Sequence, residues 1–481
     1  MNASIIRQLR KIVGPDAVLD RPEELALYEY DAGVDKGSPG AVVFPQNTEQ
    51  VSQVMRLASE NKIPVVPRGA GTGLSGGAIA REQAIVLGLS RMNKILEIDT
   101  ANQRAVVQPG VVNLELSNTA SKYGYYYAPD PSSQKACTIG GNVAENSGGP
   151  HTLALGVTVN HITGLRVVIP NGRIVELGGK AQDTCGLDLT GFFVGSEGTL
   201  AVTTEIIVKL TKLPESVATL LAIFNTVEDA ANTVVALTQS GITPAALEML
   251  DAWMLRTVEA AVHAGYPVDA AAVLLIELEG IKEVVEEQAV AVEAVCLKQN
   301  GREVRRAKNE QERQLLWLGR KTAFGAIGRI SSSYYTQDGV IPRTKIPATL
   351  AEIERISKSY DLIIGNVFHA GDGNLHPLIL FDGRDPKQFE KSRNAGKEIM
   401  QFVLSVGGSI TGEHGVGMEK MNLMPLMFTP DDLDVMTRLR NAFNPDSILN
   451  PQKMLPGAHM CREITAPLPK AVVEAAPGVP V

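Results

Sequence analysis

Two histidines on either side of a short glycine turn are the residues with the clearest chemical potential. His369 and His376 flank Gly371 and Gly373, which can bend the chain so that both imidazoles face one point. A carboxylate, Glu413, follows in a second glycine-rich stretch. Two imidazoles and one carboxylate are a common ligand set for a divalent metal and leave a coordination position for another ligand. The residue types alone leave a second interpretation equally open, in which the histidines only form hydrogen bonds within the turns.

The neighbours of these residues are expected to have other roles. Asp372, inside the turn, is expected to form the turn or to hydrogen-bond a metal ligand rather than to bind the metal. His414 follows Glu413 directly, and adjacent side chains of an extended segment point in opposite directions. His414 can therefore act separately from Glu413. The metal itself could be zinc, manganese or iron, because imidazole and carboxylate ligands suit all three.

A dense glycine segment at residues 64–80, PVVPRGAGTGLSGGAIA, indicates that bare backbone lies close to a bulky anion. Its amide groups, hydroxyls and one guanidinium predict a phosphate cradle, formed by Arg68, Gly69, Ala70, Gly71, Thr72, Gly73, Ser75 and Gly76. The spacing also satisfies G-x-G-x-x-G, but short β-rich runs follow the loop where a dinucleotide-binding fold would have a helix. A plain structural turn is the alternative interpretation.

Two later segments share this glycine-rich character. Residues 129–151 contain too few apolar residues for a core element, so a long loop or a wall of a ligand site is expected. Residues 194–202 predict a turn that enters a strand. Three such segments within one domain of ~200 residues indicate a single long ligand that is contacted at several points.

The elements that must position these segments are strands and helices of ordinary length. Apolar spacing predicts a short opening helix over residues 5–13. A strand from residue 41, a helix over residues 48–61 and a second strand then lead to the glycine loop.

The pattern changes near residue 213. Long helices over residues 227–240 and 281–299 alternate there with apolar strands such as residues 273–278. This alternation predicts an α+β second domain.

The composition limits the possible classes of protein. A chain of 481 residues is too long for one hydrophobic core, so two or three domains are expected. The formal net charge of −8 argues against a nucleic acid partner. The cysteines include no C-x-x-C pair, and no apolar run resembles a signal peptide or a membrane span. A reducing, cytoplasmic location is expected, with any peripheral contact at the cytoplasmic face of the inner membrane made through partners.

Four stretches in the same order resemble the vanillyl-alcohol-oxidase superfamily: PRGAGTGLSGGA, YYAPDPSSQKACTIGGNVAENSGG, VFHAGDGNLHPLILFD and GSITGEHGVGMEKM. Within it, the chain is similar over nearly its whole length to the family of glycolate oxidase D subunits (GlcD) and FAD-linked D-2-hydroxyacid dehydrogenases. The resemblance implies an α+β fold with a two-part FAD-binding domain and an α+β cap domain. The implied boundaries are 1–213 for the FAD-binding domain, 214–440 for the cap and substrate domain, and 441–456 for a C-terminal return to the flavin. Residues 457–481 are rich in Pro, Ala and Val without a helical or strand period, so a loose tail is expected there.

The resemblance identifies the long ligand as FAD, with its pyrophosphate on the glycine loop. The further FAD contacts that it implies are Pro129, Asp130, Thr138, Gly141, Asn146, Gly148, Glu197, Gly198, Val202 and Asn450. Some relatives attach FAD covalently through a histidine of the phosphate loop, and this loop has none, so non-covalent FAD is expected. His151 and His161, near the second segment, are expected to be structural residues that form hydrogen bonds.

The resemblance also implies an activity. Metal-using relatives oxidise 2-hydroxy acids, which implies a metal at the histidines and Glu413. A base must remove the hydroxyl proton as hydride leaves the α-carbon for flavin N5, and His414 suits that role. The substrate carboxylate needs a cation, which the resemblance places at Arg320, with Arg343 as the second choice.

The resemblance leaves more than one possibility open for the substrate and for the electron acceptor. Residues 334–338 lack the lysine of relatives that act on D-2-hydroxyglutarate, so a short acid, glycolate or D-lactate, is expected. The chain has no iron–sulfur motif, so electrons are expected to pass to a second flavin-domain subunit and an iron–sulfur subunit, or to a quinone-linked carrier. A stand-alone D-lactate dehydrogenase and a non-catalytic flavin-bearing assembly subunit are the alternatives.

Overall fold

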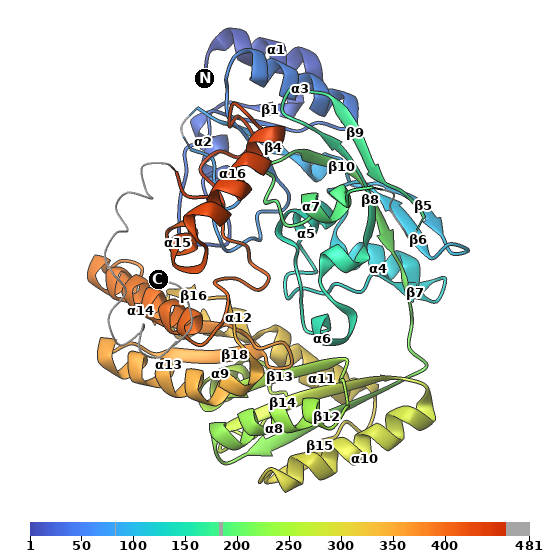
Figure 1. Cartoon of the computed structure of the whole chain (residues 1–481), viewed down its shortest axis with the longest axis vertical. Coiled ribbons are helices and arrows are strands. Elements are labelled where there is room, and N and C mark those ends of the chain that lie inside the picture. The colour runs from blue at the N-terminus through green and yellow to red at the C-terminus, as the bar shows by residue number, and fades with distance from the viewer. Residues whose placement is uncertain (82, 182–185, 458–481) are drawn as a thin grey trace. The chain divides into compact units, whose positions relative to one another are not determined.

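The chain folds into two compact units, seen in a computed structural model that describes residues 1–81, 83–181 and 186–457 (Figure 1). Among these residues, unit 1 contains 1–149, 156–213 and 413–457, and unit 2 contains 150–155 and 214–412. The main part of unit 2 begins at Pro214, and the short segment 150–155 belongs to it as well. Unit 2 ends at Gly412 rather than at residue 440, because the residues that follow bond to loops of unit 1. Most of the expected tail, residues 458–481, lies outside the described residues.

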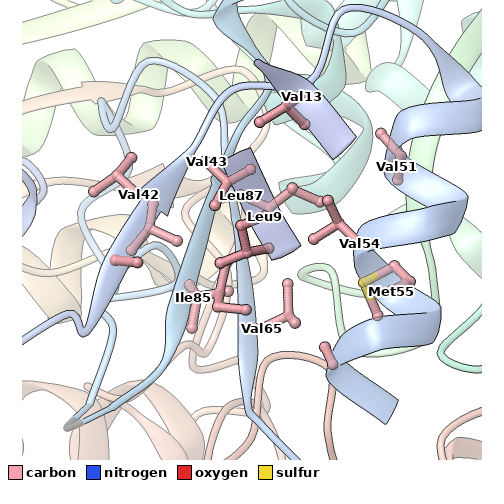
Figure 2. Close-up of a cluster of buried hydrophobic side chains, with 14 of the residues drawn as sticks. Leu9, Val13, Val42, Val43, Val51, Val54, Met55, Val65, Ile85 and Leu87 are labelled. Atoms are coloured by element: carbon pink, nitrogen blue, oxygen red, sulfur yellow. The ribbon is translucent and has the colours of Figure 1, made fainter. Parts of the chain in front are cut away.

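The first sheet of unit 1 carries the glycine loop at the end of one of its strands. Its strand order is β1-β2-β4-β3, in which β2 and β3 both run parallel to β4. The helices α1 and α3 pack on it, and Figure 2 shows their side chains meeting those of the strands. The predicted opening helix and the strand–helix–strand run to the loop are confirmed. The elements are α1 (Ala3–Val13), β1 (Val18–Leu19), α2 (Pro22–Leu25), β2 (Ala41–Val43), α3 (Thr48–Glu60), β3 (Val65–Arg68) and β4 (Ile85–Gly88).

The second sheet of unit 1 is antiparallel, with strand order β5-β6-β10-β8-β9. Its elements and those around it are β5 (Ile95–Asp99), β6 (Arg104–Val107), α4 (Asn113–Ser121), β7 (Tyr125–Tyr126), α5 (Ile139–Glu145), β8 (Ile162–Val168), β9 (Ile174–Gly178), α7 (Leu189–Phe193), β10 (Val202–Lys209), β11 (Thr211–Lys212), α15 (Met424–Met427) and α16 (Pro430–Phe443). The two sheets form the two-part domain that the sequence predicts.

Unit 2 is built on a sheet with strand order β15-β12-β14-β13-β18, and β18 also pairs with β19 and β20. The helices α8 and α10 pack against β12, and α9 packs against β18. The predicted α+β character is confirmed. The elements are α6 (Thr152–Leu155), β12 (Ser216–Phe224), α8 (Val227–Gln239), β13 (Ala246–Asp251), α9 (Ala252–Val262), β14 (Ala272–Gly280), α10 (Lys282–Lys298), β15 (Glu303–Arg306), α11 (Glu310–Lys321), α12 (Ala323–Ile327), β16 (Ser333–Thr336), β17 (Gly339–Val340), α13 (Ile346–Tyr360), β18 (Ile364–His369), β19 (Asn374–Leu375), β20 (Pro377–Phe381) and α14 (Pro386–Ser405).

None of the described helices combines the length and the apolar character needed to cross a membrane.

Candidate functional site

The glycine loop of unit 1 begins where β3 ends at Arg68. Gly71 and Gly76 have φ angles of +73° and +78°, a conformation that residues with a side chain rarely adopt. A Cβ atom on Gly69 would lie only 2.5 Å from the Thr138 hydroxyl. Bare backbone therefore brings the loop against the second glycine-rich segment.

Arg68 supplies a buried cation to this loop. Its guanidinium lies 5.6 Å from the centre of the Tyr28 ring, and its Nη1 atom is buried without a hydrogen bond to the described residues. Burial lowers the pKa of Arg68, and Asp31 partly opposes this effect. A buried guanidinium with an unused donor fits a phosphate-bearing ligand such as FAD.

The second segment is not a continuous loop, and in this respect the prediction for residues 129–151 is wrong. Residues 139–145 form α5, because Ile139 and Val143 lie one turn apart and are both buried in the core of unit 1. The Thr138 hydroxyl caps this helix by accepting a hydrogen bond from the Gly141 amide at 3.3 Å. The prediction was wrong because this helix is short and rich in glycine and small polar residues, which are typical of loops.

The other predicted FAD contacts of this segment lie on both sides of α5. The Pro129 carbonyl accepts a hydrogen bond from Asn113 at 2.8 Å, and Asp130 lies against the backbone of Gly149. Asn146 ends α5 in a left-handed conformation and accepts a hydrogen bond from the Val159 amide. Gly148 is buried.

The third segment joins the C-terminal part of unit 1. Glu197 and Gly198 have φ angles of +51° and +65°, and β10 begins at Val202. The Asn450 side chain donates hydrogen bonds to the carbonyls of Glu197 at 2.6 Å and of Gly77 at 3.1 Å. Asn450 thereby connects the third segment to the glycine loop, and its buried Oδ1 atom has no hydrogen bond within the described residues.

A pair of buried carboxyl groups, absent from the sequence predictions except for Glu197, lies in the same region. The Glu197 carboxylate accepts hydrogen bonds of 2.7 Å from the amides of Val416 and Gly417. Burial, and then the nearby Glu197, raise the pKa of Glu145 well above its usual range. A Cβ atom on Gly415 would lie 2.3 Å from one Glu145 oxygen and 2.9 Å from one Glu197 oxygen, so both carboxyl groups face the same point.

The two predicted metal-binding histidines lie together in unit 2. His369 ends β18 and His376 follows β19, and their rings are perpendicular with centroids 5.2 Å apart. Gly373 in the turn between them has a φ angle of +75°, and the Asp372 amide bonds back to the His369 carbonyl. The turn therefore folds the two imidazoles toward one another, as the sequence predicts. Two buried imidazoles suit zinc, manganese or iron.

Arg320 reaches the same cluster from α11. Its Nη2 atom lies 2.5 Å from a carboxylate oxygen of Glu248, and the same carboxylate lies 2.8 Å from Nδ1 of His369. Burial alone would raise the pKa of Glu248, but Arg320 and His369 together hold the pKa below its ordinary value. Glu248 was missed by the sequence analysis, although an acidic residue inside the apolar run of β13 was a usable signal.

Arg343, the second choice for the substrate carboxylate, contacts the histidine turn. Arg343 donates from Nε to the carbonyl of Gly371 in the histidine turn. Asp338, a second missed residue, accepts hydrogen bonds from the Thr411 hydroxyl at 2.6 Å and the Gly412 amide at 2.9 Å. Glu413 follows Gly412 directly in the chain and belongs to unit 1.

The segment that carries Glu413 and His414 differs from the prediction in one respect. Residues 412–414 form bends instead of an extended strand, because glycines flank the pair. The His414 carbonyl accepts a hydrogen bond from the Ser75 hydroxyl at 2.9 Å, which places its backbone beside the glycine loop of unit 1.

His151 and His161, the two histidines near the second segment, contact other side chains of the protein. His151 lies 3.2 Å from a Glu277 oxygen and stacks on Trp317 with centroids 5.7 Å apart. His161 is buried with its ring edge-to-face to Tyr127.

Comparison with known proteins shows which class of protein this chain resembles in sequence and in fold. The family model "FAD binding domain" matches residues 39–178, and the model "FAD linked oxidases, C-terminal domain" matches residues 213–454. The structure of p-cresol methylhydroxylase with substrate bound has a TM-score of 0.80 at 18% identity, over 94% of this chain and 96% of that chain. For 4-ethylphenol oxidase from Gulosibacter chungangensis these values are 0.78, 17%, 94% and 97%. The matched family models and the fold define a two-domain, FAD-dependent oxidoreductase of the vanillyl-alcohol-oxidase type.

Relatives in sequence define the family more closely. The glycolate oxidase subunit GlcD of Escherichia coli (strain K12) is 46% identical over 464 residues, 96% of this chain and 93% of that protein. GlcD of Bacillus subtilis (strain 168) is 42% identical over 93% of this chain and 96% of its own, and a D-lactate dehydrogenase of Anaerostipes hadrus is 32% identical over 90% and 91%. The chain belongs to the FAD-linked oxidases, the family of these glycolate oxidase subunits and D-lactate dehydrogenases. The family, fold and enzyme class expected from the sequence are confirmed.

Proposed function

We propose that this enzyme oxidises glycolate or D-lactate to the corresponding 2-oxo acid. The observation that carries the proposal is a buried guanidinium, Arg320, that shares a carboxylate with the imidazole of His369 in unit 2. A cation of this kind suits a small acid with one carboxylate, and the similar proteins include glycolate oxidase subunits and a D-lactate dehydrogenase. FAD, when bound, accepts the two electrons that the substrate loses.

Each residue has a separate role in this proposal. Arg320 binds the substrate carboxylate; Arg343 is the weaker choice because its Nε already donates to a carbonyl of the histidine turn. His369, His376 and Glu413 would hold a divalent metal, which would lower the pKa of the substrate hydroxyl. His414 accepts the hydroxyl proton, since an imidazole has a suitable pKa for a general base.

The FAD is bound without a covalent link. Residues 68–77 contain neither histidine nor cysteine to form one. Acid precipitation of the holoenzyme should release the yellow colour into the supernatant, and flavin that stays on the denatured polypeptide would contradict this assignment.

The enzyme works within a larger assembly, with a second flavin-domain subunit and an iron–sulfur subunit as the proposed partners. Support comes from the names of the similar proteins, which are called subunits of glycolate oxidase, and from the lack of a cluster-binding cysteine motif. Any contact with the cytoplasmic face of a membrane would be made through those partners. The isolated chain should reduce artificial dyes well and oxygen poorly; rapid, stoichiometric peroxide formation by the chain alone would refute the assembly.

The deciding experiment is anaerobic reduction of the bound flavin by a panel of D- and L-2-hydroxy acids. Glycolate and D-lactate should bleach the flavin absorbance, and L-lactate and D-2-hydroxyglutarate should not. The relative rates for glycolate and D-lactate distinguish a glycolate oxidase subunit from a stand-alone D-lactate dehydrogenase, the second candidate supported by the relative from Anaerostipes hadrus. A flavin that no acid of the panel reduces would refute the proposed function.

A further inference from the structure

We propose that Glu248 is a positioning residue that holds the metal-binding imidazole of His369 and the guanidinium of Arg320 as one unit. The inference rests on the roles proposed above for those two residues. It adds a shared carboxylate that makes metal binding and substrate binding depend on the same side chain.

The strand pairing places Glu248 opposite His369. In the antiparallel pair of β13 and β18 these two residues are direct partners, so their side chains emerge next to each other on one face. The Nδ1 atom of His369 lies 2.8 Å and 3.0 Å from the two Glu248 oxygens. The exposed fractions are 0% for Glu248, 3% for His369 and 1% for Arg320, so water does not compete for these contacts.

This contact decides which imidazole nitrogen can bind a metal. A carboxylate only accepts hydrogen bonds, so the bond requires the proton of His369 on Nδ1. The opposite nitrogen, Nε2, then keeps its lone pair. A carboxylate behind a metal-binding histidine also fixes the plane of the ring and makes the imidazole a stronger ligand.

The same carboxylate fixes one edge of the guanidinium. Arg320 has a long, flexible side chain, and the 2.5 Å contact between its Nη2 atom and Glu248 holds it in place. The Nε and Nη1 atoms are buried and have no hydrogen-bond acceptor among the described residues. A buried donor without an acceptor is costly, so these N–H groups favour an incoming carboxylate.

A second buried glutamate of the same sheet provides a matched control. Glu277 on β14 accepts hydrogen bonds from Thr219 at 2.6 Å and from Trp317 at 2.5 Å, and it lies 3.3 Å from Arg313. These contacts tie strands to α11 and involve neither His369 nor Arg320. Glu277 therefore matches Glu248 in burial and charge but not in its partners.

The test is a double-mutant cycle on metal affinity in the full-length, FAD-loaded protein. Removing the Glu248 charge alone leaves Arg320 buried without a counter-ion, which can prevent folding. The double variant Glu248→Gln/Arg320→Met removes both charges and avoids this problem. Zn²⁺ affinity is measured by chelator competition for the parent, Arg320→Met, Glu248→Gln, the double variant and Glu277→Gln, together with the glycolate KM where turnover remains.

Glu248→Gln and the double variant should bind Zn²⁺ about 10- to 100-fold more weakly than the parent. Arg320→Met should retain the parental affinity, because His369 keeps its carboxylate. Glu248→Gln should also raise the glycolate KM. Glu277→Gln should lower thermal stability and leave the Zn²⁺ affinity of the His369 site unchanged; Glu277 also contacts His151, so Zn²⁺ binding is compared with that of a His151→Ala background.

A double variant that binds Zn²⁺ as tightly as Arg320→Met would overturn the inference while leaving the proposed function intact. A parent that binds no Zn²⁺ would remove the metal assignment and this inference with it. The flavin-reduction panel separately tests the proposed function.

Discussion

The candidate sites of the two units are built from different parts of the chain. In unit 1 the cradle is made mainly of backbone: glycines approach other segments closely, and Asn450 joins two loops through their carbonyls. In unit 2 the site is made of side chains from two strands and a helix, and one carboxylate contacts both an imidazole and a guanidinium.

This difference predicts which kind of substitution should weaken ligand binding at each site. A backbone cradle fails when a side chain is added, because the added atoms keep two segments apart. A cluster of shared charges fails when a side chain is removed or neutralised, because its buried partner loses its counter-ion. The predictions below test this contrast, from the largest expected effect to the smallest.

The largest effect is expected at His414, the proposed base. Its backbone carbonyl accepts a hydrogen bond from Ser75, so replacing its side chain leaves this backbone contact with the glycine loop in place. His414→Ala should slow flavin reduction by glycolate about 10²- to 10⁴-fold, the range for a lost general base. Stopped-flow absorbance gives the rate, and the FAD content should stay at one per chain because the backbone contact remains. Parental reduction rates across neutral pH would exclude His414 as the base.

Neutralising a metal ligand is expected to have the next largest effect. Glu413→Gln should weaken Zn²⁺ binding by at least about 100-fold, because an amide is a poorer metal ligand than a carboxylate. Loss of a residue that only hydrogen-bonds a metal ligand weakens metal binding by about 10- to 100-fold, so loss of a ligand itself should cost at least the upper value. Chelator competition measures the affinity, and FAD content serves as the control. Unchanged Zn²⁺ binding would remove Glu413 from the ligand set.

Adding a side chain to the cradle should affect the cofactor and spare the metal. Gly69→Val places a Cβ atom 2.5 Å from the Thr138 hydroxyl, an overpacking that costs about 1–3 kcal/mol. FAD affinity should fall about 10- to 100-fold by titration of the FAD-free protein.

Gly179→Ala is the matched control for this variant, since a Cβ atom there meets nothing within 4 Å, the backbone has no positive φ, and the residue is not among the predicted FAD contacts. Its FAD affinity should remain near that of the parent. Equal affinities for Gly69→Val and the parent would show that the loop does not need bare backbone at residue 69.

The smallest effect is expected at Glu145 and Glu197, the pair of carboxyl groups in unit 1. Like the cluster of unit 2, this pair consists of buried ionisable side chains. Because the pKa of Glu145 is raised in the folded protein, folding takes up a proton there, and its contribution to stability falls as pH rises above the usual glutamate range. Glu145→Gln imitates the protonated form, so it should raise the Tm of FAD-free protein by roughly 2–4 °C at pH 8, with a smaller gain near pH 5. A gain that does not depend on pH would contradict the raised pKa.

Much of the fold could be predicted from the sequence because its signals are local. Apolar spacing located α1, α3, α8 and α10, and glycine clusters located the loops after β3 and before β10. The histidine turn could also be predicted, because eight consecutive residues contain both imidazoles and the glycines that bend the chain between them. Two local predictions were wrong: α5, whose glycine-rich sequence resembles a loop, and residues 412–414, which form bends where an extended segment was expected.

The partners of these residues could not be predicted in the same way. Glu248 lies 121 residues before His369, and Glu197 lies 253 residues before Asn450, yet both pairs are in contact. The sequence determined where the chain bends and which segments offer donors, acceptors and charges, because those properties depend on neighbouring residues. Only the tertiary structure decided that Glu248 joins His369 to Arg320, because strand pairing and burial bring distant charges together and leave them no water to bind instead.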